Sequence, residues 1–271
     1  MTQKELITKY GITPNKALGQ NFLADEDAAE RIVSLAAEPG LAVLEIGPGL
    51  GALTRPLAGR GLPLAAVELD AAMCEVLRAE LNEKAVIVNA DFLKCDLMGI
   101  RAALGGGEIS VVGNLPYYIT AAAVQRLVLS GLAIRRMTLM MQKEAAERFT
   151  ARPGDRNYVP VTVLAQRLFD IRPVMELSPA SYYPQPEVSS TVLLFERNGC
   201  EMPEKLPALT KAAFQMRRKT LQNNLAAMGL SKAEAAELIK ACGLDPAVRA
   251  ERLTVEELTR LAEAIKTKVR A

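Results

Sequence analysis

Short apolar runs alternate with amphipathic stretches along the first 198 residues of the chain. Continuous apolar runs of about four to eight residues are typical of buried strands, whereas apolar residues about three or four positions apart are typical of helices. The pattern predicts helices at 25–38, 71–82, 118–130 and 143–150, no helix before residue 25, and strands at 41–46, 64–67, 85–89, 111–114, 137–142, 168–174 and 188–195. This alternation indicates parallel βαβ units, and hence an α/β fold with a seven-stranded sheet.

The pattern changes after residue 198. Prolines at 203 and 207 follow a polar segment and mark a linker, and beyond them only helical spacing recurs, near 205–216, 218–228, 231–241 and 254–268. We therefore predict two domains, an α/β domain over 1–198 and a small all-helical domain over 199–271. A chain of 271 residues is long enough for this division.

The charge is nearly balanced, with 33 Lys and Arg against 31 Asp and Glu, but it is unevenly distributed. From Cys200 onward the chain has 13 basic and 9 acidic residues, an excess that favours a polyanionic partner for this end of the chain. Arg217, Arg218 and Lys219 start the predicted helix at 218–228, where cations oppose the helix dipole. We interpret them as phosphate ligands, and a solvated basic turn is the alternative.

The chain contains no histidine, and its four cysteines are far apart in the sequence. This composition argues against a zinc site and a disulfide framework, and it excludes nucleophilic schemes that need an imidazole base. No segment reaches the length of about 18 apolar residues that a membrane span requires, and residues 1–10 lack the apolar core of a signal peptide. We expect a soluble, cytoplasmic protein without a metal ion.

A glycine-rich turn, GPGLG at 47–51, follows the strand at 41–46 and precedes a predicted helix. This order lets the backbone approach a ligand closely, and Glu68, 21 residues after Gly47, is placed to bind ribose hydroxyls. The pattern fits a Rossmann-like domain for NAD or for S-adenosylmethionine. The acidic Glu45 inside an apolar strand, Asp91 after the third strand and Asn114 after the fourth together favour S-adenosylmethionine, although each acid alone fits a solvated strand end.

The fourth strand ends in NLPY at 114–117. The Asn114 amide oxygen and the Leu115 carbonyl, turned outward before Pro116, provide two adjacent acceptors, which suit an amino group. Tyr117 adds an aromatic face on which an unstacked base can lie. The alternative is a strand-ending turn with a core tyrosine.

Six motifs in this order resemble those of the ribosomal RNA adenine N6-dimethyltransferases. They are QNFL at 20–23, EIGPGLG at 45–51, ExD at 68–70, NxDF at 89–92, NLPY at 114–117 and YxPxPxV at 182–188. The segments FQMRRKTLxNNL at 214–225 and RAERL at 249–253 resemble the branch that modifies 16S RNA. One departure is Glu187 and Ser189, where the family usually has Lys and Asp, and it puts an RNA-backbone contact of this loop in doubt.

The resemblance implies methyl transfer from S-adenosylmethionine to N6 of two adjacent adenosines near the 3′ end of 16S ribosomal RNA, during small-subunit biogenesis. It assigns Leu115, Tyr117 and Tyr182 to the target base, residues 199–271 to the ribosome, and six residues to the cofactor: Asn21, Leu23, Gly47, Glu68, Asp91 and Asn114. Asn114 would also hold the target amine. A loop anchor remains the alternative for Tyr182. Alternatives for the whole chain are a 23S RNA methyltransferase of the macrolide-resistance type, a Rossmann oxidoreductase and a non-catalytic assembly factor, and we expect a monomer.

Overall fold

The computed structural model describes residues 1–15 and 19–265 of the chain. Two compact units are present, one formed by residues 1–146 and 171–197 and the other by residues 147–170 and 198–271. The second unit thus also includes the segment 147–170, and the domain limits 1–198 and 199–271 remain a prediction. The ends of the predicted domain and of the predicted helix at 254–268 lie outside the described residues.

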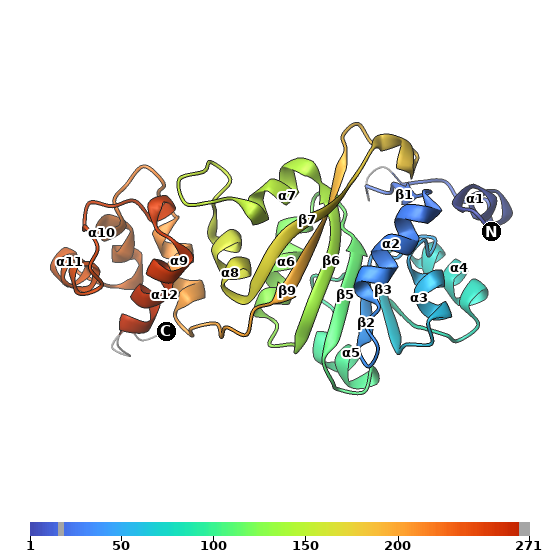
Figure 1. Cartoon of the computed structure of the whole chain (residues 1–271), viewed down its shortest axis with the longest axis horizontal. Helices are drawn as coiled ribbons and strands as arrows, with labels where there is room; N and C mark the ends of the chain where they lie inside the picture. Colours follow the sequence, from blue (N-terminus) through green and yellow to red (C-terminus); the bar gives the residue numbers. More distant parts are fainter. Residues whose placement is uncertain (16–18, 266–271) are drawn as a thin grey trace. The chain divides into compact units, whose positions relative to one another are not determined.

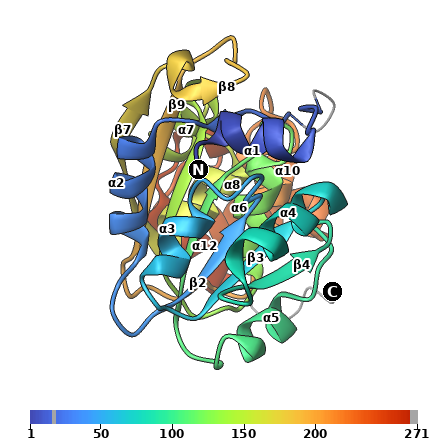
Figure 2. The same ribbon diagram turned by 90° about the vertical axis from the view of Figure 1, so that its right-hand side faces the viewer.

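A seven-stranded sheet has the strand order β4-β3-β2-β5-β6-β9-β7 (Figures 1 and 2). Strands β2 to β6 pair in parallel, and β9 pairs antiparallel with β6. The sequence prediction of seven strands at these places is confirmed. The strands are β2 (Ala42–Ile46), β3 (Leu64–Glu68), β4 (Val86–Asn89), β5 (Ile109–Asn114), β6 (Ile134–Gln142), β7 (Phe169–Leu177) and β9 (Ser190–Arg197).

The strand order reverses between β2 and β5. The chain goes from β2 outward to β3 and β4, then returns to β5 on the other side of β2 and continues to β6. In open α/β sheets, ligands bind outside the carboxyl ends of the strands at such a reversal. The two strands come very close there. A Cβ atom on Gly113 of β5 would lie only 2.6 Å from the Ile46 carbonyl oxygen of β2, so this position needs glycine.

The helices between the strands have caps and apolar faces that explain their positions. Helix α2 starts after Asp25, whose side chain accepts a hydrogen bond from the Ala28 N–H, and its buried face packs on Leu53 and Leu57. The predicted helices at 25–38, 71–82, 118–130 and 143–150 are confirmed. The helices are α2 (Glu26–Ala36), α3 (Thr54–Gly59), α4 (Ala71–Leu81), α5 (Leu97–Ala103), α6 (Thr120–Leu129) and α7 (Lys143–Thr150).

The N-terminal segment contains a helix that the sequence pattern did not predict, α1 (Gln3–Tyr10). Thr2 and Glu5 form a reciprocal capping box at its start, and Gly11 ends it in the left-handed conformation. Leu6 is fully buried and packs with Phe22, Leu50, Met73 and Val76. Helix α1 is therefore part of the folded first unit.

A separate two-stranded sheet joins segments that are far apart in the sequence. Strand β1 (Phe22–Leu23) pairs antiparallel with β8 (Tyr182–Tyr183), so that Leu23 lies opposite Tyr182. A short 3₁₀ turn, Pro179–Ser181, precedes β8. The QNFL segment and the proline loop, which are separate motifs in the sequence, are therefore neighbours in the fold.

The second unit is helical. Tyr158 is fully buried, donates a hydrogen bond of 3.0 Å to the Leu253 carbonyl, and has its ring 6.0 Å from that of Phe214. It thereby joins the segment before α8 to the C-terminal helices. The helices are α8 (Pro160–Leu168), α9 (Leu206–Ala213), α10 (Leu221–Asn224), α11 (Lys232–Ala241) and α12 (Val255–Ala264), with 3₁₀ turns at Leu225–Met228 and Ala250–Arg252.

The predicted helix at 218–228 is wrong in its first part. Residues 214–219 form turns, and α10 begins only after Thr220, whose side chain accepts a hydrogen bond from the Asn223 N–H. Arg217, Arg218 and Lys219 therefore lie in a turn, so the argument from the helix dipole does not apply to them. All three are exposed.

Candidate cofactor and substrate site

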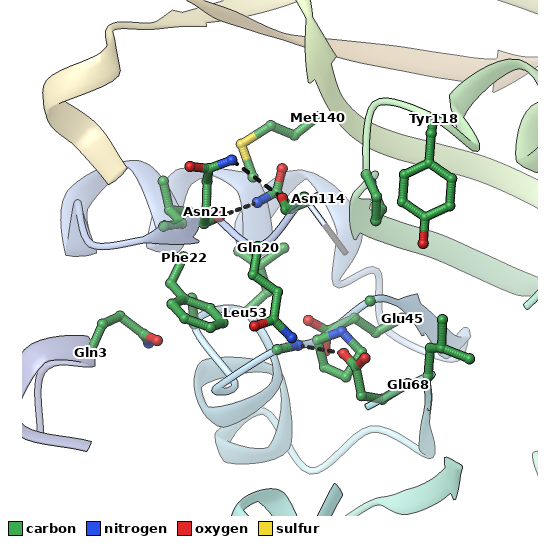
Figure 3. A pocket seen from close by; sticks show the side chains of 18 residues that line it. Gln3, Gln20, Asn21, Phe22, Glu45, Leu53, Glu68, Asn114, Tyr118 and Met140 are labelled. Carbon is green, nitrogen blue, oxygen red and sulfur yellow. Dashed lines mark hydrogen bonds between the residues drawn. The ribbon is translucent and has the colours of Figure 1, made fainter. Parts of the chain in front are cut away.

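A pocket opens at the carboxyl ends of β2, β3 and β5 (Figure 3). Its empty space is about 700 Å³, a volume that includes space open to solvent. Five of the six predicted cofactor residues line it: Asn21, Leu23, Gly47, Glu68 and Asn114. Three different strand ends and the N-terminal segment thus meet at one site.

Asp91, the sixth predicted cofactor residue, is not part of this lining. It follows β4, the strand next to β3, and its Oδ1 atom accepts a hydrogen bond of 2.8 Å from the Leu93 N–H. Its Oδ2 atom lies 3.5 Å from Nζ of Lys94, and the side chain is 36 % exposed. The carboxylate is therefore anchored at the neighbouring strand end, where it remains accessible.

The glycine-rich turn brings its backbone close to its neighbours. Gly47 and Gly49 both have positive φ angles, of 65° and 55°. A Cβ atom on Gly49 would lie 3.1 Å from the Phe22 ring, and one on Gly47 would lie 3.6 Å from the Asn114 carbonyl oxygen. Glycine thus supplies both the required backbone conformation and the free space on the floor of the pocket.

Glu68 is held in a fixed orientation by the backbone. Its two carboxylate oxygens accept hydrogen bonds from the N–H groups of Gly49, at 3.0 Å, and Asp70, at 2.9 Å. The side chain is 8 % exposed. Burial raises the pKa of Glu68, and the backbone hydrogen bonds oppose that rise. A carboxylate oriented in this way at the end of β3 is suited to accept hydrogen bonds from hydroxyl groups.

Glu45 is a buried acid near the carboxyl end of the apolar strand β2, and it also lines the pocket. Burial raises its pKa to about 8, the nearby Thr54 hydroxyl opposes the rise, and the charge of Glu68 adds to it. Its Oε2 atom has no hydrogen-bond partner among the described residues. An unsatisfied buried acid at this position favours a ligand that carries positive charge.

Asn114 lines the site and is held through its amide nitrogen. Its Nδ2 atom donates a hydrogen bond of 3.1 Å to the Asn21 carbonyl, which leaves Oδ1 as the group available to a donor. The next residue, Leu115, is anchored by a hydrogen bond of 2.9 Å from its N–H to the Met140 carbonyl. Both residues predicted to hold an amino group are therefore fixed through their nitrogen atoms.

The two predicted aromatic residues, Tyr117 and Tyr182, are not part of the pocket lining. Tyr117 is half-buried, and burial raises its pKa while contacts with Ser190 and Gln142 lower it. Tyr182 is 3 % exposed, and its hydroxyl donates to Sδ of Met140 at 2.9 Å. Tyr118, which the sequence analysis did not select, is the tyrosine that lines the pocket, and it is 60 % exposed.

Gln3 and Met140 also line the pocket, although no sequence motif marks either residue. Met140 belongs to the buried strand β6, where the apolar pattern gives no sign of a ligand. Gln3 lies on the unpredicted helix α1. The capping box formed by Thr2 and Glu5 was the one sequence signal that could have located it.

The sequence matches the family described as "Ribosomal RNA adenine dimethylase" over residues 11–267. The chain belongs to this family. Among its relatives are proteins named "Ribosomal RNA small subunit methyltransferase A" from Lactobacillus acidophilus and Desulfitobacterium hafniense. The first is 38 % identical, covering 98 % of this chain and 96 % of the relative, and the second is 40 % identical, covering 96 % and 95 %.

Two solved structures share the family's fold with this chain. A dimethyladenosine transferase from Plasmodium falciparum has a TM-score of 0.74 at 19 % identity and covers 89 % of this chain and 95 % of its own. The 23S rRNA methyltransferase ErmE has a TM-score of 0.66 at 27 % identity and covers 90 % and 99 %. The Rossmann-like methyltransferase fold with added helices is thereby confirmed.

S-adenosylmethionine is the cofactor of this family, and the residues of the site fit it. Glu68 supplies a fixed carboxylate for hydroxyl groups, the glycine turn leaves open space, and the unsatisfied oxygen of Glu45 suits a cation. Within residues 1–15 and 19–265, no helix is long and apolar enough to cross a membrane. The same residues contain no cluster of three or more Cys, Asp or Glu side chains that could hold a metal ion.

Proposed function

We propose that this protein transfers methyl groups from S-adenosylmethionine to N6 of two adjacent adenosines near the 3′ end of 16S ribosomal RNA, giving N6,N6-dimethyladenosine during small-subunit biogenesis. The observation that carries the proposal is the fixed amide of Asn114, whose oxygen is left for a donor at the end of β5. The names of relatives that match nearly the whole chain support the small subunit as the substrate.

The cofactor would lie across the ends of β2, β3 and β4. Glu68 would bind the ribose hydroxyls, Asp91 would accept a hydrogen bond from the adenine amine, and Gly47 would leave room for the backbone of the turn to approach. Asn21 and Leu23 would close the site from β1. When bound, S-adenosylmethionine supplies a methyl group that is already electrophilic because it is attached to a sulfonium.

The protein's task is to prepare the nucleophile, because the lone pair of an aromatic amine is delocalised into the ring. The Asn114 amide oxygen and the Leu115 carbonyl would accept hydrogen bonds from the two N6–H groups and draw the nitrogen toward tetrahedral geometry. Positioning and fixed dipoles then supply most of the catalysis. No imidazole base is needed, since the methylated nitrogen is acidic enough to lose its proton to water.

A target adenine stacked in RNA must be extruded to reach these acceptors. Tyr117 would stack on the extruded base, which contributes about 1–3 kcal/mol per base in comparable sites. Tyr182 would pack near the other face of the base. Its burial and its bond to Met140 favour the alternative in which Tyr182 anchors the proline loop and supports the site from behind.

A basic turn formed by Arg217, Arg218 and Lys219 would bind the RNA backbone. All three side chains are exposed, and no carboxylate of the described residues forms a salt bridge with them. Arg217 donates a hydrogen bond of 3.0 Å to the Arg156 carbonyl, which fixes the turn against a second exposed loop of the same unit. These uncompensated cations favour phosphates over the alternative of a merely solvated turn.

The proposal is tested by mapping N6,N6-dimethyladenosine in 16S and 23S RNA from cells with and without this protein. We expect the modification to disappear from 16S RNA in its absence and to return with the wild-type gene but not with an Asn114→Ala variant. Loss from 23S RNA instead would favour the macrolide-resistance alternative. An unchanged pattern in both RNAs would reject methyl transfer to these sites.

Two further expectations depend on this function. A small-subunit substrate places the protein in the cytoplasm, where ribosomal subunits are assembled. We also propose that it acts as a monomer, which light scattering of the purified protein measures directly. Calorimetry with S-adenosylmethionine and with NAD separates the proposal from a Rossmann oxidoreductase, because we expect S-adenosylmethionine to bind and NAD not to bind.

A further inference from the structure

Gln3 is a buried polar residue on the wall of the cofactor pocket. Its side chain is 5 % exposed and lines the same space as Glu45, Glu68 and Asn114, although it comes from the N-terminal helix α1. Figure 3 shows it entering from the side opposite Glu45 and Glu68, with the Phe22 ring between them. The pocket is thus bounded by a residue outside every motif of the sequence analysis.

The position of Gln3 is fixed by packing at both ends of α1. Near its start, Leu6 is fully buried against Phe22 and Leu50, the latter within the glycine-rich turn. At its end, Lys9 and Tyr10 both contact Oε1 of Glu80 on α4 at 2.7 Å. A helix held in this way presents Gln3 to the pocket as a stable feature of the unit.

The Oε1 atom of Gln3 is buried and has no hydrogen-bond partner among the described residues. Buried amide oxygens are nearly always satisfied, because an unmet acceptor lowers stability. An amide oxygen can only accept a hydrogen bond, so the missing partner of Gln3 must be a donor. The pocket itself therefore specifies the kind of ligand group that belongs beside Gln3.

The donors of S-adenosylmethionine are its ribose hydroxyls, its adenine amine and its α-ammonium group. The first two are assigned to Glu68 and Asp91, and Glu68 lies across the pocket from Gln3 (Figure 3). We propose that Gln3 accepts a hydrogen bond from the α-ammonium group of the cofactor, so that α1 forms the amino-acid end of the cofactor site. This inference rests on the proposed function, and it adds a residue that selects ligands carrying the amino-acid group.

The test is calorimetric binding with a matched pair of variants. Gln3→Met keeps the length of the side chain and removes its polar end, whereas Lys4→Met makes the same replacement at an exposed position of the same helix. S-adenosylhomocysteine and 5′-methylthioadenosine share a thioether and differ by the amino-acid end. We expect Gln3→Met to weaken binding of S-adenosylhomocysteine by about 10-fold, the effect of losing a hydrogen bond to a charged group. Its binding of 5′-methylthioadenosine should not change. Lys4→Met should bind both ligands like the wild-type protein.

A second comparison separates the two charged groups of the amino-acid end. Decarboxylated S-adenosylmethionine keeps the ammonium group and lacks the carboxylate, so Gln3→Met should weaken its binding as much as that of S-adenosylmethionine. Equal loss for 5′-methylthioadenosine, or no loss for the decarboxylated cofactor, would overturn the assignment. Thermal unfolding of Gln3→Met at the wild-type temperature verifies that α1 is intact.

The outcomes also separate this inference from the proposed function. If the wild-type protein binds no S-adenosylhomocysteine, the proposed function fails. If the wild-type protein binds it and Gln3→Met binds it equally well, methyl transfer stands and the role of Gln3 is rejected.

Discussion

The side-chain nitrogen of Asn114 donates a hydrogen bond of 3.1 Å to the backbone carbonyl of Asn21, 93 positions earlier in the sequence. This bond decides which end of the amide stays available to a donor, because a carbonyl can pair only with the NH₂ group. The chain segment that closes the cofactor pocket thereby also orients the proposed acceptor for the target amine. The proposed cofactor site and the proposed substrate site thus share one amide.

We expect Asn114→Ala to reduce methyl transfer by about 100-fold or more, the effect of removing one fixed group from a transition state. Cofactor affinity should change much less, because the proposed role of the amide oxygen is toward N6. Single-turnover rates and calorimetric affinities measure the two effects separately. A rate that falls only in step with cofactor binding would make Asn114 a cofactor ligand alone.

Glu68→Ala and Asp91→Ala should each weaken binding of S-adenosylmethionine about 10-fold, since each removes a charged hydrogen-bond acceptor. Circular dichroism should show an unchanged fold. Glu75→Ala is the control, because it removes an exposed carboxylate of α4 outside the pocket. Wild-type titrations in both test variants would contradict the assignment of the strand ends to the cofactor.

Glu45 should make the stability of the ligand-free protein depend on pH. Its pKa in the fold is about 8 against an ordinary 4.5, so between these values the folded chain keeps a proton that the unfolded chain has lost. The free energy of unfolding should therefore fall as pH rises through this window, by at most about 1.4 kcal/mol per pH unit.

Urea unfolding at several pH values measures this decline, and Glu45→Gln isolates the contribution of Glu45. The groups around Glu45 are the carboxylate of Glu68 on β3, whose raised pKa adds a decline of the same sign, and the uncharged Thr54 on α3. Glu45→Gln should flatten the profile and raise stability near pH 8. Parallel profiles for the two proteins would show that Glu45 ionises normally in the fold.

The carboxyl group of Glu45 should also affect how strongly ligands of different charge bind. An ionised Glu45 attracts the sulfonium of S-adenosylmethionine, whereas S-adenosylhomocysteine lacks that charge. The preference for S-adenosylmethionine should accordingly increase from pH 6.5 to pH 8.5, a window of ~2 units around the shifted pKa, and Glu45→Gln should abolish the increase. Competition binding at the two pH values measures this ratio, and a constant wild-type ratio would exclude the interaction.

Replacing Arg217, Arg218 and Lys219 together with Gln should weaken binding to small subunits and flatten its salt dependence, because fewer counterions are released. Cofactor affinity should stay the same, since these residues belong to the second compact unit. The matched control replaces three other exposed lysines of that unit with Gln, namely Lys211, Lys232 and Lys240. If both triple variants lose affinity equally, net charge accounts for binding and the turn has no special role.

The sheet was predictable because buried parallel strands leave long apolar runs, and the glycine turn was predictable because few residues tolerate its backbone. Helix α1 was not predicted, because one buried leucine among polar residues gives a weak periodic signal. The turn at 214–219 was missed because nothing in its composition separates it from a helix. Its position depends instead on Asn224, whose side chain bonds the Ala213 and Met216 carbonyls.

A residue of the candidate site was predictable where it stands at the end of a predicted strand. Glu68 and Asn114 were found in this way, and both line the pocket. Burial of Tyr182 depends on the pairing of β8 with β1 and on Met140 of β6, which are contacts between segments far apart in the sequence. The contribution of Gln3 depends likewise on the packing of α1 on Phe22 and Leu50.

The pairing of β1 with β8 involves two residues on each strand, and so short a sheet has little stability of its own. It persists because Leu23 and Tyr182 are buried in the core. The Asn21 carbonyl lies directly before β1, so a displacement of β1 would disturb the hydrogen bond that orients Asn114. The orientation of the proposed acceptor for the target amine thus depends on two residue pairs that are held in place by burial in the core rather than by their own sheet.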